Sequence, residues 1–252
     1  MSKKEHAWHL PSSTTKHYQW FRNLADFHDL TLAWIKELQI QRLPHLMTRG
    51  QDHDVTQNLW MLDSLSETKI DLLLDDTSPD DVLGRLEHTV WTVQAWTLIN
   101  LFERTPQPER DALNTVLDLT AWKMGRNLGE KRWSGMPAKS RQDLRLLFLA
   151  MSDSPFGRSP HGEPFLVKRA TDNELVFEFH RCPHQVSFPE VQPVADQLCK
   201  LHSQWIRGFV YSLNNGISIE DTTGSPRCSH RWSFLFASST EHETANEPGA
   251  LT

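Results

Sequence analysis

Residues 165–179 have the sequence FLVKRATDNELVFEF, and this stretch decides the fold class. Apolar runs rich in Phe, Leu and Val stand at both ends, as in β-strands, and they flank turn-forming residues at 171–173. Two such runs around a short polar turn indicate a β-hairpin. The stretch therefore predicts antiparallel sheet at the point where the helical spacing of the preceding sequence ends.

The region before the hairpin, residues 17–152, has the apolar periodicity of α-helices. We predict helices from His17 to the break at Pro44, over residues 55–74, from Leu113 to a close near Gly125 and Gly129, and over residues 144–151. Residues 1–16 carry charge without an apolar pattern, so we expect a flexible N-terminus.

One more helix start is marked by Ser78, Pro79 and the acids at 80 and 81. Serine can cap a helix, proline fits its first turn, and acidic side chains are favoured at the positive end of the helix dipole. The helix that opens here is predicted to stop before Pro106.

The region after the hairpin mixes both periods. A helix over residues 191–213 is predicted, with a buried stripe at Val194, Leu198, Leu201, Trp205 and Phe209. Strands are predicted at 217–219 and 232–236 around the turn-prone residues 222–226. The fold class is therefore α+β, with a helical N-terminal half followed by a small antiparallel sheet packed with one long helix.

Two boundaries follow from these patterns. Residues 153–237 form the α+β region that bears the Cys and His residues, and residues 238–252 are polar and acidic without a pattern, which predicts a disordered tail. The boundary near residue 153 is either a change of structural class inside one unit or a domain border.

Composition limits the partners. The chain of 252 residues has a net charge of −6, so no global positive field attracts nucleic acid. No run approaches the roughly 20 apolar residues that cross a bilayer, and we expect a cytoplasmic protein with a small-molecule substrate. Three cysteines are too few for a disulfide scaffold of this length, so their thiols are expected to remain available for ligation or catalysis.

Each of the three cysteines is followed closely by a histidine. The three motifs are Cys182-Pro183-His184, Cys199-Lys200-Leu201-His202 and Cys228-Ser229-His230. Cys182 follows one predicted strand and Cys228 precedes another, so antiparallel pairing of these strands would put both thiols at one edge of the sheet. Cys199 and His202 are three residues apart on the predicted helix and share a face.

Three interpretations of these cysteines stay open. The thiols can be small apolar residues of the core. Cys182 with His184 can be a nucleophile and its base. Alternatively Cys182, Cys199 and Cys228 can bind a transition metal, zinc or iron, or an iron–sulfur cluster. One of His184, His202 or His230 would complete the ligands, and the centre would be structural or would activate water.

The arrangement of residues 176–183, then Leu198-Cys199 on a helix, then residues 224–228 leading into Trp232-Ser233-Phe234, resembles the family of L-2-amino-thiazoline-4-carboxylic acid hydrolases. The resemblance spans residues 110–237, and the glycine spacing at 125–129 is similar to a helix end of that family. The family commonly has an acidic residue shortly after its helical cysteine, where this chain has His202.

The resemblance implies hydrolysis of a carbon–nitrogen or carbon–sulfur bond in a small cyclic amidine-like substrate. It implies a nucleophile and a base, for which Cys182 and His184 are the first candidates, with Cys199 and Cys228 nearby. Arg181 or Arg227 would hold the substrate carboxylate.

The helical half offers weaker signals. Glu87-His88 and His28-Asp29 are residue types found in helical di-iron sites, but the paired Glu-x-x-His motifs of those sites are missing. Ten tryptophans stand against two tyrosines, which predicts either large apolar anchors in a helical core or a stacking surface for a flat ligand.

Overall fold

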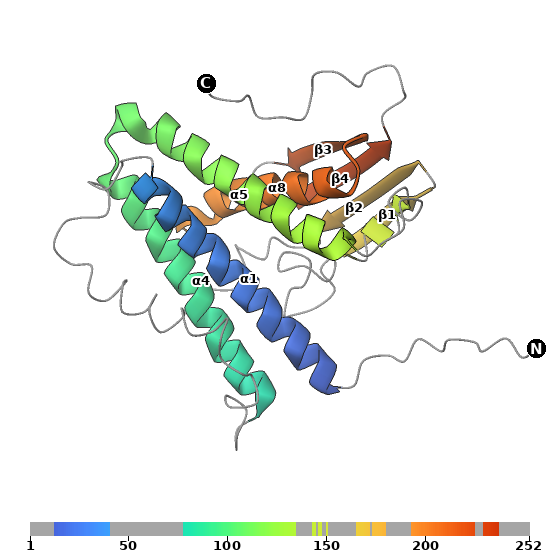
Figure 1. The fold of residues 1–252 in the computed structure, drawn as a ribbon, viewed down its shortest axis with the longest axis horizontal. Helices are drawn as coiled ribbons and strands as arrows, with labels where there is room; N and C mark the ends of the chain where they lie inside the picture. The colour runs from blue at the N-terminus through green and yellow to red at the C-terminus, as the bar shows by residue number, and fades with distance from the viewer. Residues whose placement is uncertain are drawn as a thin grey trace, which may run out of the picture.

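A computed structural model of the chain describes residues 13–40, 78–134, 143–144, 146–147, 150, 165–171, 173–179, 193–224 and 229–236. The elements in chain order are α1 (Ser13–Ile40), α4 (Pro79–Arg104), the 3-10 helix η2 (Gln107–Glu109), α5 (Arg110–Trp133), β1 (Phe165–Ala170), β2 (Glu174–Phe179), α8 (Ala195–Leu213), β3 (Ile217–Gly224) and β4 (Ser229–Phe236). Figure 1 shows the helical part followed by a sheet that packs with α8. The predicted α+β class is confirmed.

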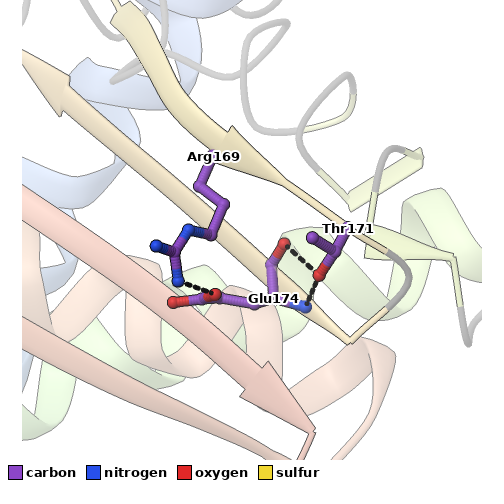
Figure 2. A network of polar contacts seen from close by, with 3 residues as sticks. All are labelled: Arg169, Thr171 and Glu174. Carbon is purple, nitrogen blue, oxygen red and sulfur yellow. Dashed lines mark hydrogen bonds and ion pairs between the residues drawn. The ribbon is translucent and has the colours of Figure 1, made fainter.

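The sheet has four strands in the order β1-β2-β4-β3, and all neighbours are antiparallel. The hairpin of β1 and β2 turns where the sequence predicts it. The hydroxyl of Thr171 accepts a hydrogen bond from the backbone N–H of Glu174 at 2.9 Å, and Arg169 forms an ion pair with the Glu174 carboxylate at 2.8 Å (Figure 2). A local side chain thus closes the turn.

Helices α1 and α4 run parallel to each other. The Nε2 atom of His17 lies 3.1 Å from the Oδ1 atom of Asp80, and the side-chain amide of Gln94 donates to the hydroxyl of Thr31 at 3.3 Å. Both contacts join residues 63 positions apart, so the two helices stay in one alignment over the 14 residues from His17 to Thr31. Fourteen residues are two heptads, and the seven-residue heptad is the sequence repeat of helices that pack side by side in a coiled coil.

Helices α5 and α8 also run parallel, and their backbones are in direct contact. Gln197 contacts Asn114 near the start of the two helices, and a Cβ added at Gly129 would strike the side chain of Ser212 near their end. At Gly125 and Gly208 an added Cβ would strike backbone carbonyls of the facing helix. Only glycine allows backbones to approach so closely.

This packing corrects one prediction. The sequence predicted that the helix from Leu113 closes near Gly125 and Gly129, but α5 continues to Trp133. Both glycines are buried inside the helix, where they form part of its contact with α8. Gly-x-x-x-Gly here marks a helix contact instead of a helix end.

The predicted start of α4 is confirmed in position and corrected in detail. The helix begins at Pro79 with Asp80 and Asp81 in its first turn, and it ends at Arg104 before Pro106. The Ser78 side chain, however, forms no capping hydrogen bond. Its backbone carbonyl accepts from Val82 instead, at 3.1 Å.

Element ends differ from the predictions elsewhere. Helix α1 begins at Ser13, inside the segment expected to be flexible, and α8 begins at Ala195. Strands β3 and β4 are longer than predicted, because β3 continues through the turn-prone residues 222–224 and β4 begins at Ser229. Leu144 and Leu147 are helical and buried within the helix predicted at 144–151. The helix predicted at 55–74 and the tail at 238–252 lie outside the described residues.

The core joins the helices to one face of the sheet. Leu175 and Ile217 of the sheet belong to the same apolar cluster as Leu198 and Phe209 of α8. All five residues of the stripe predicted for α8 are buried. Tryptophans contribute heavily to this interior: the buried ones are Trp34, Trp91, Trp122, Trp133 and Trp205. Most described tryptophans therefore serve as core anchors, with Trp96 exposed by 52%. No described helix has the length and apolarity needed to span a bilayer.

Candidate thiol–imidazole site on α8

Cys199 lies on the side of α8 that faces away from α5. Gly208 marks the α5 side, because an added Cβ there would strike the Trp122 carbonyl of α5. Cys199 precedes Gly208 by nine residues, which at 3.6 residues per turn is about two and a half turns. The two residues therefore lie on opposite sides of the α8 axis, and the Cys199 thiol is on the side away from α5.

The side that carries Cys199 is buried in the core to which the sheet also contributes. Ile206 and Val210 follow Cys199 by seven and eleven residues and so share its face. Both belong to the cluster that contains Leu175 and Ile217 of the sheet. Arg207 also donates from its guanidinium to the carbonyl of Ile219 at 3.3 Å, which shows that β3 runs back along α8.

His202 lies one turn after Cys199 and is buried to the same degree. The exposed fractions are 4% for Cys199 and 3% for His202, and the Nε2 atom of His202 is screened from solvent. Cys199 is a thiol and is not part of a disulfide. The prediction that the two residues share a helix face is thus confirmed, and the face is an interior one.

Sequence reasoning missed Ser203, which is also buried, at 7% exposure. Ser203 follows Cys199 by four residues, and that spacing on a predicted helix is the signal that could have identified it. Three polar side chains, from Cys199, His202 and Ser203, therefore lie along one buried stretch of α8.

The sheet brings together the strand ends that flank the other two cysteines in the sequence. Glu178, next to the end of β2, pairs with Arg231 near the start of β4. Thr223 near the end of β3 pairs with His230 of β4. The end of β2, the end of β3 and the start of β4 therefore share one edge of the sheet, and the antiparallel pairing of β2 with β4, which the sequence interpretation required as a condition, is present.

Of the remaining candidate residues, His230 alone is among those that the structure describes. His230 occupies a register position in β4 opposite Thr223. The others lie outside the described residues: Arg181, Cys182, His184, Arg227 and Cys228. The described part of the site is therefore Cys199 and His202 on α8 together with the sheet edge.

The chemistry open to the described pair is that of a thiol and an imidazole one turn apart in a dry setting. An imidazole can accept the thiol proton, which makes the sulfur nucleophilic. Metal binding needs more ligands, since a structural zinc site takes four. Within the ranges that the structure describes, no group of three or more His, Cys, Asp or Glu side chains is placed to hold a metal ion.

The di-iron arrangement considered for the helical half also finds no such group among the described residues. Glu87 and His28 are both buried, at 6% and 2% exposure. The Glu87 carboxylate accepts hydrogen bonds from the indoles of Trp20 and Trp91, and burial raises its pKa to about 7. Glu87 is thus occupied by tryptophan donors.

No protein-family model matches the chain, and no curated protein or solved structure is significantly similar to it.

Proposed function

We propose that the protein is a hydrolase of a small cyclic amino acid derivative that contains sulfur or nitrogen, of the thiazoline or cyclic amidine type. Its site would form between the Cys199–His202 face of α8 and the sheet edge. One observation carries the proposal: strand ends that flank Cys182 and Cys228 in sequence share one sheet edge, and β3 runs from α8 to that edge.

Chain connectivity supports a shared site. Cys228 directly precedes Ser229, the first residue of β4, and Cys182 is three residues beyond the end of β2. Three residues span at most about 11 Å, so chain connectivity ties each thiol to a strand end at this edge, Cys182 to the end of β2 and Cys228 to the start of β4. The resemblance to thiazoline carboxylate hydrolases, which rests on the same three cysteines, points to the same grouping.

In the proposed reaction, water or a thiolate adds to the sp² carbon between sulfur and nitrogen. With water, a C–O bond forms, the C=N double bond becomes a C–N single bond whose nitrogen takes one proton of the water, and the C–S bond breaks as the second proton goes to the sulfur. With the Cys182 thiolate, a bond from its sulfur to the same carbon forms first, and the ring C–S bond breaks as the leaving sulfur takes the proton that Cys182 gave to its base. Water then adds to this carbon, the bond to the Cys182 sulfur breaks, and the two water protons go to the nitrogen and to the Cys182 sulfur. The net change is the addition of one water and the release of a free thiol. Cys182 with His184 remains our first choice of nucleophile and base, and His202 would accept the proton of Cys199.

Arg181 or Arg227 would pair with the substrate carboxylate, since each adjoins one of the cysteines that flank this edge. The burial of Cys199 and His202 would keep water from competing for their hydrogen bonds. A non-catalytic metal or iron–sulfur protein with the same cysteines is the alternative function.

The test is thiol release from 2-amino-thiazoline-4-carboxylate by the full chain, purified without air and assayed for metal. We expect Cys199→Ser and His202→Gln to lower kcat/KM at least about 100-fold with an unchanged circular dichroism spectrum. Gln204→Ala, on the same helix but toward α5, is the matched control and should retain activity.

Two results would count against the proposal. Full activity in Cys199→Ser and Cys182→Ser would remove its chemical basis. A stoichiometric metal that is lost on Cys→Ser substitution, in a protein without thiol release, would favour the metal-binding alternative.

A further inference from the structure

The interface of α1 and α4 carries a row of polar residues at heptad spacing. On α4 the row consists of Asp80, Glu87 and Gln94, seven residues apart. Asp80 and Gln94 meet His17 and Thr31 of α1 in one constant alignment. The same alignment places Glu87 level with Leu24 of α1. Leu24 is apolar, so its side chain cannot form a hydrogen bond with the carboxyl of Glu87.

Two tryptophans supply partners to Glu87 instead. Trp91 follows it by one turn on α4, Trp20 comes from α1, and both indole N–H groups donate to the carboxylate. The Trp91 ring also packs against Phe27 of α1, with 4.6 Å between the ring centroids. Glu87 therefore sits in an aromatic contact that exists only while α1 covers α4.

Burial is the dominant influence on this carboxyl. It raises the pKa of Glu87 from 4.5 to about 7, against the two indole hydrogen bonds, which lower it. No charged side chain is among the causes of this shift. The protonated form is therefore the one that the packed helices favour.

The charged groups around the interface are spread over three helices. On α1, His28 lies one turn beyond Leu24, and His17 lies two turns before Leu24 and is paired with Asp80 of α4. On α4, His88 is the exposed residue next to Glu87. Asp26 of α1 also lies among these groups. Burial raises its pKa, Arg132 of α5 and Arg22 of α1 oppose the rise, Asp29 adds to it, and Lys131 of α5 opposes it most weakly.

We propose that Glu87 makes the pairing of α1 with α4 sensitive to pH across the neutral range: the protonated carboxyl favours the packed helices, and the carboxylate loosens them. This inference is independent of the proposed hydrolase site. A group whose pKa is raised on folding contributes its full stabilisation at pH values below its pKa in the unfolded state. That stabilisation is lost as the pH rises through its pKa in the folded state. The window here therefore runs from about 4.5 to 7.

Hydrogen exchange of the full chain, followed by mass spectrometry on peptides from residues 20–31, tests the proposal. If opening exposes Glu87 fully, the shift from 4.5 to about 7 predicts a fall in protection of about 30-fold between pH 5.5 and 8.5, after correction for intrinsic exchange. Glu87→Gln should abolish this dependence. Glu103→Gln, an exposed glutamate on the same helix, should retain it.

A second pair of variants keeps the test decisive if Glu87→Gln does not fold. Trp20→Phe removes a donor that favours the carboxylate, so the midpoint of the change in protection should move to higher pH. Trp96→Phe, an exposed tryptophan on α4, should leave the midpoint in place. Equal pH dependence in wild type and Glu87→Gln, or a midpoint that Trp20→Phe leaves unchanged, would overturn the proposal.

Discussion

The two parallel helix pairs of this protein are held in different ways. In α5–α8 the backbones meet at Gly125 and Gly208, where no side chain fits between them. In α1–α4 the contact is made by side chains, with Gln94 on Thr31 in a buried layer and Glu87 among indoles. Both pairs have polar side-chain contacts, such as Gln197 with Asn114 between α8 and α5, and the α5–α8 pair adds direct contact between the two backbones.

This difference bears on function. Close backbone contact leaves little room for sliding, so we expect α8, which carries the Cys199 and His202 of the proposed site, to keep its alignment with α5. A polar layer specifies alignment at some cost in stability, and α1–α4 is the pair for which we propose a response to pH.

The largest effect is expected at the glycine contacts. Gly125→Ala and Gly208→Ala each place a methyl group against a backbone carbonyl that cannot rotate away, and should destabilise the fold by about 3 kcal/mol in urea unfolding. Gly84→Ala on α4 is the control, since nothing lies within 4 Å of its added Cβ, and it should stabilise by about 0.5 to 1 kcal/mol. Wild-type stability in Gly125→Ala would disprove the close contact.

An intermediate effect is expected in the polar layer. Thr31→Val removes the acceptor of the Gln94 amide, whose Oε1 already lacks a hydrogen-bond partner among the described residues, and should cost about 1 to 3 kcal/mol. The double variant Thr31→Val with Gln94→Met removes the whole polar contact and should regain or exceed wild-type stability. Thr89→Val, an exposed threonine of α4, should change little.

A double variant that is less stable than Thr31→Val alone would contradict this account. The layer would then contribute net stability in addition to alignment.

The sequence predicted the elements better than their contacts. Local rules were sufficient for the start of α4 at Pro79, the hairpin turn at Thr171 and the buried stripe of α8, because neighbours in the chain determine them. Gly125 was misinterpreted as part of a helix end, since a glycine needed for close packing and one needed for a cap look alike without the facing helix.

The candidate site shows the same division. The shared helix face of Cys199 and His202 follows from their spacing alone. The meeting of the ends of β2 and β3 with the start of β4 depends on the strand order, which the strand pattern alone does not determine. The tryptophan partners of Glu87 were not predicted, because Trp20 is 67 residues away and comes close only through the alignment of α1 with α4.

The smallest effect is expected at the solvent end of the α1–α4 pair. Asp80 is exposed by 79% where it meets His17, so water screens the pair and Asp80→Asn should cost no more than about 0.5 kcal/mol beyond the loss of a helix-dipole contact. Asp81→Asn is the matched control, because Asp81 shares the first turn of α4 and is exposed as well. The difference between the two variants in urea unfolding measures the pair itself. We expect that difference to shrink in high salt, and a difference above about 1 kcal/mol would mean that hydrogen bonding at this end helps to set the alignment.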